Sequence, residues 1–180
     1  MRIILAVMSV LVLVCPPVAS GQTFGLHGSG GPTMIDSGYS LAAGLGFSAG
    51  PRVTFIVDVE RTHLSSRVDS DPRGLVSAFR GGTVTLAAPA LRVSLLSRDR
   101  IGPYGLAGLA AGVSRPNVTN IFPDRISTEV RAPFFGGGIQ VPLRNRVTLF
   151  AEARMVLVVG KGADDLFAMA PFRAGLAWRF

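Results

Sequence analysis

The side chains that could carry out chemistry are few in this 180-residue chain, which has two histidines, one cysteine and 11 acidic residues. Cys15 lies in an apolar N-terminal run, and His27 and His63 are far apart in the sequence. A metal centre needs several such ligands close together, so we predict no metal site and no cofactor. Two features remain, a His-Leu-Ser triplet at residues 63–65 and a set of charged residues within apolar segments.

That set of charged residues predicts an ion-pair network. Its members are Asp58, Glu60, Arg92, Arg131, Glu152, Arg154 and Arg173. A buried charge persists only when it is paired and hydrogen-bonded, because breaking a buried pair costs about 3–5 kcal/mol. We expect the seven residues to pair wherever the fold buries them; the alternative is that some lie near a rim and are solvated.

The N-terminus has the pattern of a secretory signal peptide. Met1-Arg2 is followed by an apolar run over Ile3–Cys15, by Pro16-Pro17 and by the small residues 18–20. The run is shorter than the roughly 20 apolar residues of a membrane-spanning helix. We therefore predict a cleaved signal over residues 1–20 and a mature domain over residues 22–180. Val14 before Cys15 and the two prolines after it do not favour a lipoprotein acylation site.

The composition of the rest of the chain is unusual for a soluble protein. Hydrophobic residues make up 48%, charged residues 16%, and the mean hydropathy is +0.44, yet no later run reaches 18 apolar residues. A closed β-barrel is the other structure that satisfies every backbone group in lipid. The net charge of +7 could indicate nucleic acid, but the basic residues are scattered, so we predict no such partner.

Turn signals divide the chain into hairpins. Short polar stretches at Ala49–Arg52, Ser97–Arg100 and Pro142–Arg146 alternate with longer polar segments at Ser65–Gly81 and Ser114–Ser127, and later at Gly160–Met169. This is the pattern of periplasmic turns and outer loops. Eight extended segments are predicted: Gln22–Gly30, Gly38–Ser48, Val53–Leu64, Gly82–Leu96, Ile101–Val113, Thr128–Val141, Val147–Val158 and Ala170–Phe180.

Alternation of side chains tests these segments, because successive strand residues point to opposite faces. The second, third, seventh and last segments alternate closely, whereas the fourth, fifth and sixth, over residues 82–141, alternate less clearly. Pro89 and Pro133 in these segments predict bulges or a change of phase. The more polar face consists mostly of small residues and a few charges, which suits a crowded barrel interior. Folding the third segment onto the fourth brings Asp58 near Arg92. We also expect the network to close the lumen.

The aromatic residues Phe47, Tyr104, Trp178 and Phe180 are expected to form an interfacial girdle at the periplasmic strand ends. The last segment, with alternating apolar residues at Phe172, Leu176, Trp178 and Phe180, resembles the C-terminal strand of bacterial outer-membrane β-barrel proteins of the small eight-stranded OmpA/OmpX/opacity group. The resemblance implies an all-β, antiparallel, up-and-down transmembrane barrel in the outer membrane, and a terminal strand read by the barrel-assembly machinery.

Three functions follow from this interpretation, and a soluble ligand-binding barrel with its apolar face inward is the remaining alternative. The first is a structural or interaction barrel with a packed lumen, a monomer that meets outer-membrane lipids, including lipopolysaccharide, and external partners. The second is a small-solute channel. The third is a lipid A deacylase, because His63 and Ser65 resemble the His-x-Ser pair of that family on the lipid side of the barrel. A serine nucleophile needs a base and an orienting carboxylate, and Glu60 and Glu152 have inward parity, so we predict that the chain is not an enzyme.

Overall fold

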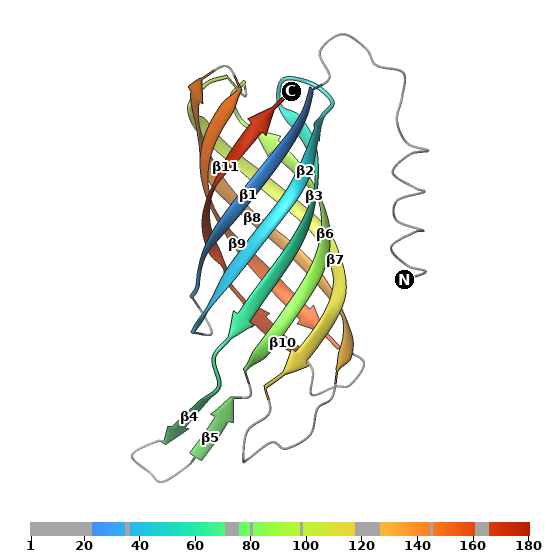
Figure 1. Cartoon of the computed structure of the whole chain (residues 1–180), viewed down its shortest axis with the longest axis vertical. Helices are drawn as coiled ribbons and strands as arrows, with labels where there is room; N and C mark the ends of the chain where they lie inside the picture. The colour runs from blue at the N-terminus through green and yellow to red at the C-terminus, as the bar shows by residue number, and fades with distance from the viewer. Residues whose placement is uncertain are drawn as a thin grey trace.

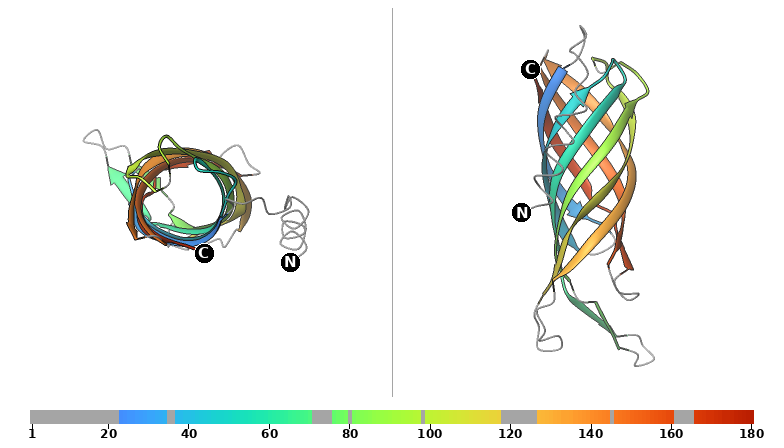
Figure 2. Two further views of the ribbon diagram at one scale, coloured as in Figure 1. Left: turned by 90° about the horizontal axis from the view of Figure 1, so that it is seen from above. Right: turned by 90° about the vertical axis from the view of Figure 1, so that its right-hand side faces the viewer.

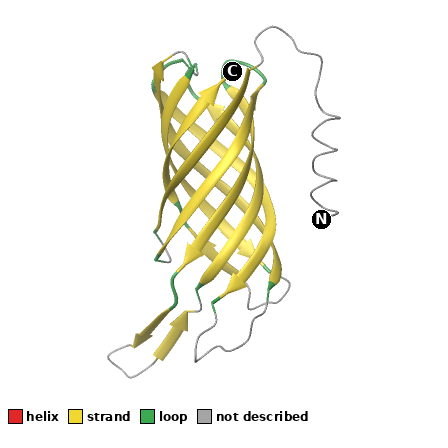
Figure 3. Cartoon of the chain, viewed as in Figure 1, coloured by secondary structure: helices red, strands yellow, loops and turns green. Residues whose placement is uncertain are grey.

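The computed structural model describes residues 23–34, 37–70, 76–79, 81–97, 99–117, 127–144, 146–160 and 166–180. The expected signal segment, residues 1–20, lies outside this part of the chain. All regular structure in the described residues is β-strand (Figure 3). Among these residues, no helix is long and apolar enough to cross a membrane.

Eight antiparallel strands close into a barrel, which Figure 1 shows from the side and Figure 2 from above. Each strand pairs with its neighbours along the chain, and β11 returns to pair with β1. The barrel strands are β1 (Thr23–Thr33), β2 (Gly38–Ser48), β3 (Val53–Leu64), β6 (Gly82–Ser94), β7 (Gly102–Pro116), β8 (Thr128–Arg144), β9 (Val147–Val159) and β11 (Phe172–Arg179). The predicted eight-stranded up-and-down barrel is therefore confirmed.

The eighth position in the barrel is occupied by two strands instead of one. The short strand β10 (Leu166–Met169) and β11 both pair with β9, and the pairing is interrupted at Ala170 and Pro171. Pro171 makes an isolated bridge to Thr33, and Met34 N–H donates to the Ala170 carbonyl at 2.9 Å. The predicted last segment thus extends further toward the loops than expected, into a stretch that was predicted as a loop.

The two ends of the barrel differ, as the turn signals predict. The connections around residues 49–52, 95–101 and 145–146 are short, and they lie at the same end as Phe180 (Figure 1); we call this the turn end. The other end, the loop end, carries a hairpin of β4 (Arg67–Ser70) and β5 (Val76–Phe79) that extends beyond the rim. This hairpin lies in the predicted polar loop Ser65–Gly81 and was not anticipated.

The prolines within the strands do not shift the register, contrary to expectation. The β6–β7 pairing keeps one register on either side of Pro89, and the β8–β9 pairing does so across Pro133. The pairs beside each proline are missing from these ladders, since proline has no N–H to donate. The register shift in β8–β9 lies instead between Pro142 and Arg144, next to the turn.

The outer wall of the barrel is apolar. Large hydrophobic side chains point outward from every barrel strand and stay exposed, among them Leu26, Leu45, Val59, Leu91, Leu109, Phe135, Leu149 and Leu176. A monomeric soluble protein rarely exposes so continuous an apolar surface. With lipid as the surrounding medium, the same wall is the expected solution.

The interior contains a second apolar region that the sequence analysis missed. It lines the loop-end half of the lumen on β6–β9 and β10, and it includes Val84, Leu86, Val130, Phe134, Val156, Val158 and Met169. In this region β6, β7 and β8 carry apolar residues on both faces, and this explains why the alternation in residues 82–141 is unclear. The polar lumen residues come from the other strands, from β9 and from the turn-end parts of β6, β7 and β8.

Candidate functional site

The most distinctive site in the described residues is a cluster of five charged side chains in the lumen. Asp58 and Glu60 come from β3, Glu152 and Arg154 from β9, and Arg173 from β11. Each pair on one strand is two residues apart, so both side chains point inward. All five are nearly or completely buried, with exposed fractions between 0% and 4%. We call these five residues the lumen cluster.

Two arginines join the three carboxylates of the lumen cluster. Arg154 Nη2 lies 2.7 Å from Asp58 Oδ2, and Arg154 Nε lies 2.8 Å from Glu152 Oε1. Arg173 Nη2 lies 2.7 Å from Glu152 Oε1, and Arg173 Nη1 lies 3.1 Å from Glu60 Oε2. The cluster therefore ties β3, β9 and β11 together across the barrel axis.

Side chains outside the cluster complete the hydrogen bonding of the carboxylates. His27 Nε2 lies 2.5 Å from Asp58 Oδ1. Glu60 Oε1 accepts from the hydroxyls of Ser40 at 2.9 Å and Thr62 at 3.2 Å. Tyr104 donates to Glu152 Oε2 at 3.0 Å. His27 is thus a hydrogen-bonded residue of the lumen.

Small residues leave the room that this network needs. A Cβ at Gly44 would lie 2.9 Å from His27 Cε1 and closer still to Asp58 Oδ1. A Cβ at Gly138 would lie 2.7 Å from the Tyr104 hydroxyl. Glycine therefore occupies these two positions on the inner face because the side chains beside them leave no room for a Cβ.

Two of the seven predicted network residues lie elsewhere. Arg92 points into the lumen, but it pairs with Thr54 in the β3–β6 register and lies nearer the turn end, so it does not contact Asp58 as expected. Arg131 is exposed on the outer face, since Val130 and Ala132 on either side of it are the buried residues of β8. The prediction that Arg131 faces the lumen was wrong because β8 has apolar residues on both faces, which hides its inward positions.

Two lumen residues were missed. Tyr104, expected in the outer girdle, is 3% exposed and points inward, whereas Trp178 and Phe180 lie on the outer face at the turn end. Gln140 is also buried and accepts a hydrogen bond from Arg92 Nη2 at 2.6 Å. The guanidinium carbon of Arg92 lies 3.6 Å from the centre of the Tyr104 ring. Because β7 and β8 are apolar on both faces, alternation carries no signal that would place these two side chains inside.

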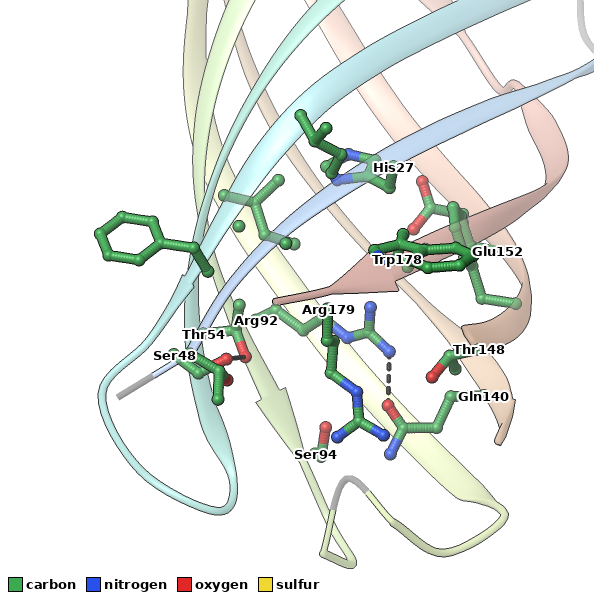
Figure 4. Close-up of a pocket in the computed structure, with 18 of the residues that line it drawn as sticks. His27, Ser48, Thr54, Arg92, Ser94, Gln140, Thr148, Glu152, Trp178 and Arg179 are labelled. Carbon is green, nitrogen blue, oxygen red and sulfur yellow. Dashed lines mark hydrogen bonds between the residues drawn. The ribbon is translucent and has the colours of Figure 1, made fainter. Parts of the chain in front are cut away.

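Between the lumen cluster and the turn end lies a cavity of about 80 Å³ (Figure 4). We call it the vestibule. Its polar lining includes Ser94, Thr148, Gln140, Arg92, Arg179 and Glu152. A water molecule occupies about 30 Å³ in the liquid, so the vestibule has room for a few waters or one small ion. On the loop side of the vestibule lie the buried side chains of the lumen cluster and the apolar interior.

The predicted His-x-Ser pair does not form a catalytic arrangement with the described residues. His63 points outward, where its ring lies 5.5 Å from that of Tyr39 and its Nδ1 lies 3.5 Å from the Thr83 hydroxyl. Ser65 is exposed beyond the end of β3. The carboxylates Glu60 and Glu152 are inside the barrel, on the other side of the wall. The described residues also contain no group of three or more potential metal ligands.

Comparisons with known proteins identify the fold. No family model and no curated protein matches the sequence. Solved structures do match. The Neisserial surface protein A has a TM-score of 0.62 at 13% identity, and the match covers 88% of this chain and 95% of that one. The N-terminal barrel domain of Pseudomonas aeruginosa OprF has a TM-score of 0.60 at 12% identity, covering 88% and 97%. Ail of Yersinia pestis has a TM-score of 0.55 at 13% identity, covering 90% and 100%.

Proposed function

We propose that this chain, which has the fold of the small eight-stranded outer-membrane β-barrels, is an integral outer-membrane scaffold with a closed lumen. The single observation that carries the proposal is the filled interior. The lumen cluster joins three strands across the barrel, and the apolar interior lies on its loop side. A barrel that is plugged in this way stabilises the membrane and displays its loop end, and it does not conduct.

The apolar outer wall supports the membrane location. Leu45, Val59 and Leu109 are more than half exposed on three different strands, and in lipid such side chains are satisfied by acyl chains. We propose that the wall contacts lipid all around, which corresponds to a monomer. Export through a signal over residues 1–20 belongs to the same proposal.

The partners that we propose are outer-membrane lipids, including lipopolysaccharide, and the barrel-assembly machinery. Phe172, Leu176, Trp178 and Phe180 would be read by that machinery, and all four side chains are exposed on the outer face of β11 or just after it. Arg61 and Arg131 point outward toward the loop end and offer charges for anionic headgroups. Arg73 and Arg80, in the predicted polar loop Ser65–Gly81, lie outside the described residues.

Planar-bilayer recording tests the closed lumen. We expect no steady conductance from the purified wild-type barrel, while a sixteen-stranded porin in the same bilayer gives open-channel steps. The Arg131→Gln variant removes a charge from the outer wall and serves as the matched control, with the same silent trace. A reproducible open state of the wild-type protein would refute the scaffold and favour the small-solute channel.

A separate measurement addresses catalysis. Mass spectrometry of lipid A from cells that produce the protein should show unchanged acylation, because His63 is on the outer wall while Glu60 and Glu152 are buried inside the barrel. Loss of an acyl chain that depends on Ser65, as tested with Ser65→Ala, would show instead that the chain is a deacylase.

A further inference from the structure

The vestibule at the turn end of the lumen gathers hydrogen-bond donors that have few acceptors. Arg92, Gln140 and Arg179 converge on this space in Figure 4. The hydroxyls of Ser94 and Thr148 line it as well. Glu152 is the acidic residue of the lining, and the lumen cluster already uses both of its oxygens: Oε1 for the two arginines and Oε2 for Tyr104.

Arg92 is the principal cation of the vestibule. Within the described residues, its guanidinium makes one hydrogen bond, to Gln140 Oε1, and has no carboxylate within 4.0 Å. The face of the Tyr104 ring, 3.6 Å away, holds the guanidinium in place. Arg92 therefore keeps N–H donors and a positive charge that face the cavity. The three carboxylates of the lumen cluster are instead shared between Arg154 and Arg173.

Gln140 gives an independent indication of a ligand. An arginine only donates hydrogen bonds, so the amide atom that faces Arg92 must be the oxygen, and the nitrogen must point the other way. Gln140 is 3% exposed, and its Nε2 is buried without an acceptor in the described residues. A buried donor with no partner costs about 1–3 kcal/mol, which an acceptor in the cavity would recover.

We propose that the vestibule binds a small tetrahedral oxyanion, either inorganic phosphate or the phosphate end of a soluble phosphomonoester. Its oxygens would accept from Arg92 and from Gln140 Nε2, with Arg179 at the mouth of the cavity. The volume of about 80 Å³ is sufficient for one phosphate group. Arg179 already pairs with the exposed Asp99 at 2.7 Å, so it contributes less than Arg92.

One glycine allows the vestibule to be filled without removing a charge. A Cβ at Gly46 would meet Thr54 Cγ2 at 3.5 Å, which is an ordinary contact, and the side chain would project among the residues that line the cavity. The Gly46→Leu variant therefore occupies the ligand's space, whereas Arg92→Gln removes the cation. Arg52→Gln is the matched control, since Arg52 is exposed at the same end and outside the lining.

Isothermal titration calorimetry with inorganic phosphate tests the proposal on the detergent-purified barrel. Heat-modifiable gel mobility first shows that each variant is folded. We expect saturable binding to the wild type and to Arg52→Gln, a loss of affinity of about tenfold or more in Arg92→Gln, and no binding to Gly46→Leu. Phosphoethanolamine in a second arm shows whether a monoester end is accepted or only free phosphate; either result is compatible with the site.

Three results would overturn the proposal. The first is that the wild-type barrel shows no saturable heat with phosphate. The second is that folded Arg92→Gln and Gly46→Leu bind phosphate as the wild type does. The third is loss of binding in Arg52→Gln, which would place the anion on the outer surface of the turn end.

Discussion

Replacing Arg173 with methionine perturbs the lumen cluster most directly. Arg173 is fully buried and lies 2.7 Å from Glu152, 3.1 Å from Glu60 and 3.9 Å from Asp58. Without it, three carboxylates face the single guanidinium of Arg154. Breaking a buried ion pair by removing one partner costs about 3–5 kcal/mol.

The contacts that survive place the expected loss near the lower end of that range. Glu152 keeps Arg154 and Tyr104, and Asp58 keeps Arg154 and His27. Glu60 keeps two hydroxyls, but its Oε2 is left with Arg154 Nη1 at 3.9 Å. We therefore expect Arg173→Met to lower the free energy of unfolding by about 3 kcal/mol. Adding Glu60→Gln should recover about 1–2 kcal/mol of the loss, because the stranded charge is removed.

Urea unfolding in detergent micelles, followed by tryptophan fluorescence, measures this effect. Trp178 is the single tryptophan, and it lies on the outer wall at the turn end, away from Arg173. The matched control is Arg179→Met on the same strand. Arg179 pairs with the exposed Asp99, so its replacement should cost less than about 1 kcal/mol. A loss below 1 kcal/mol for Arg173→Met, or a double variant less stable than the single one, would show that Arg173 does not stabilise the carboxylates of the lumen cluster.

Three further predictions concern the wall, the apolar interior and the polar network. Leu45→Arg places a charge on the outer face between Leu26 and Val57. In lipid vesicles it should lower the free energy of unfolding by about 2–4 kcal/mol, whereas Tyr39→Arg at the loop end should lower it by about 0–1 kcal/mol. Equal losses would contradict a lipid-facing wall. Phe134→Ala empties part of the apolar interior, where Phe134 is 5% exposed, and should lower the free energy of unfolding by about 3–5 kcal/mol; a neutral result would mean that this region is not packed. Tyr104→Phe removes the donor to Glu152 and should cost about 1.5–3 kcal/mol in the same urea assay, with no change in gel mobility.

The sequence predicted the architecture well because two physical signals are local. The turn residues mark the hairpins, and alternation in β2, β3, β9 and β11 assigns the two faces. Five residues of the lumen cluster were predicted to lie inside on this basis, and the structure brings them together. The parity of a strand is enough to identify such residues, since a charge on an inward position needs partners.

The remaining errors arise where these local signals are weak. β6, β7 and β8 are apolar on both faces, so parity could not place Arg131 outside or Tyr104 inside. The partner of Asp58 depends on the closure of the barrel, because Arg154 on β9 is far from Asp58 in the sequence and meets it across the lumen. The two-part eighth strand and the β4–β5 hairpin likewise depend on strand pairing, which turn residues alone do not predict.

Heat-modifiable gel mobility of the outer-membrane fraction tests whether the chain is a closed barrel in that membrane. We expect the protein in that fraction, an unheated sample that migrates as a compact barrel, and a shift to the position of the unfolded chain after boiling. Identical migration before and after boiling, or recovery of the protein in the soluble fraction without detergent, would contradict a closed barrel embedded in the outer membrane.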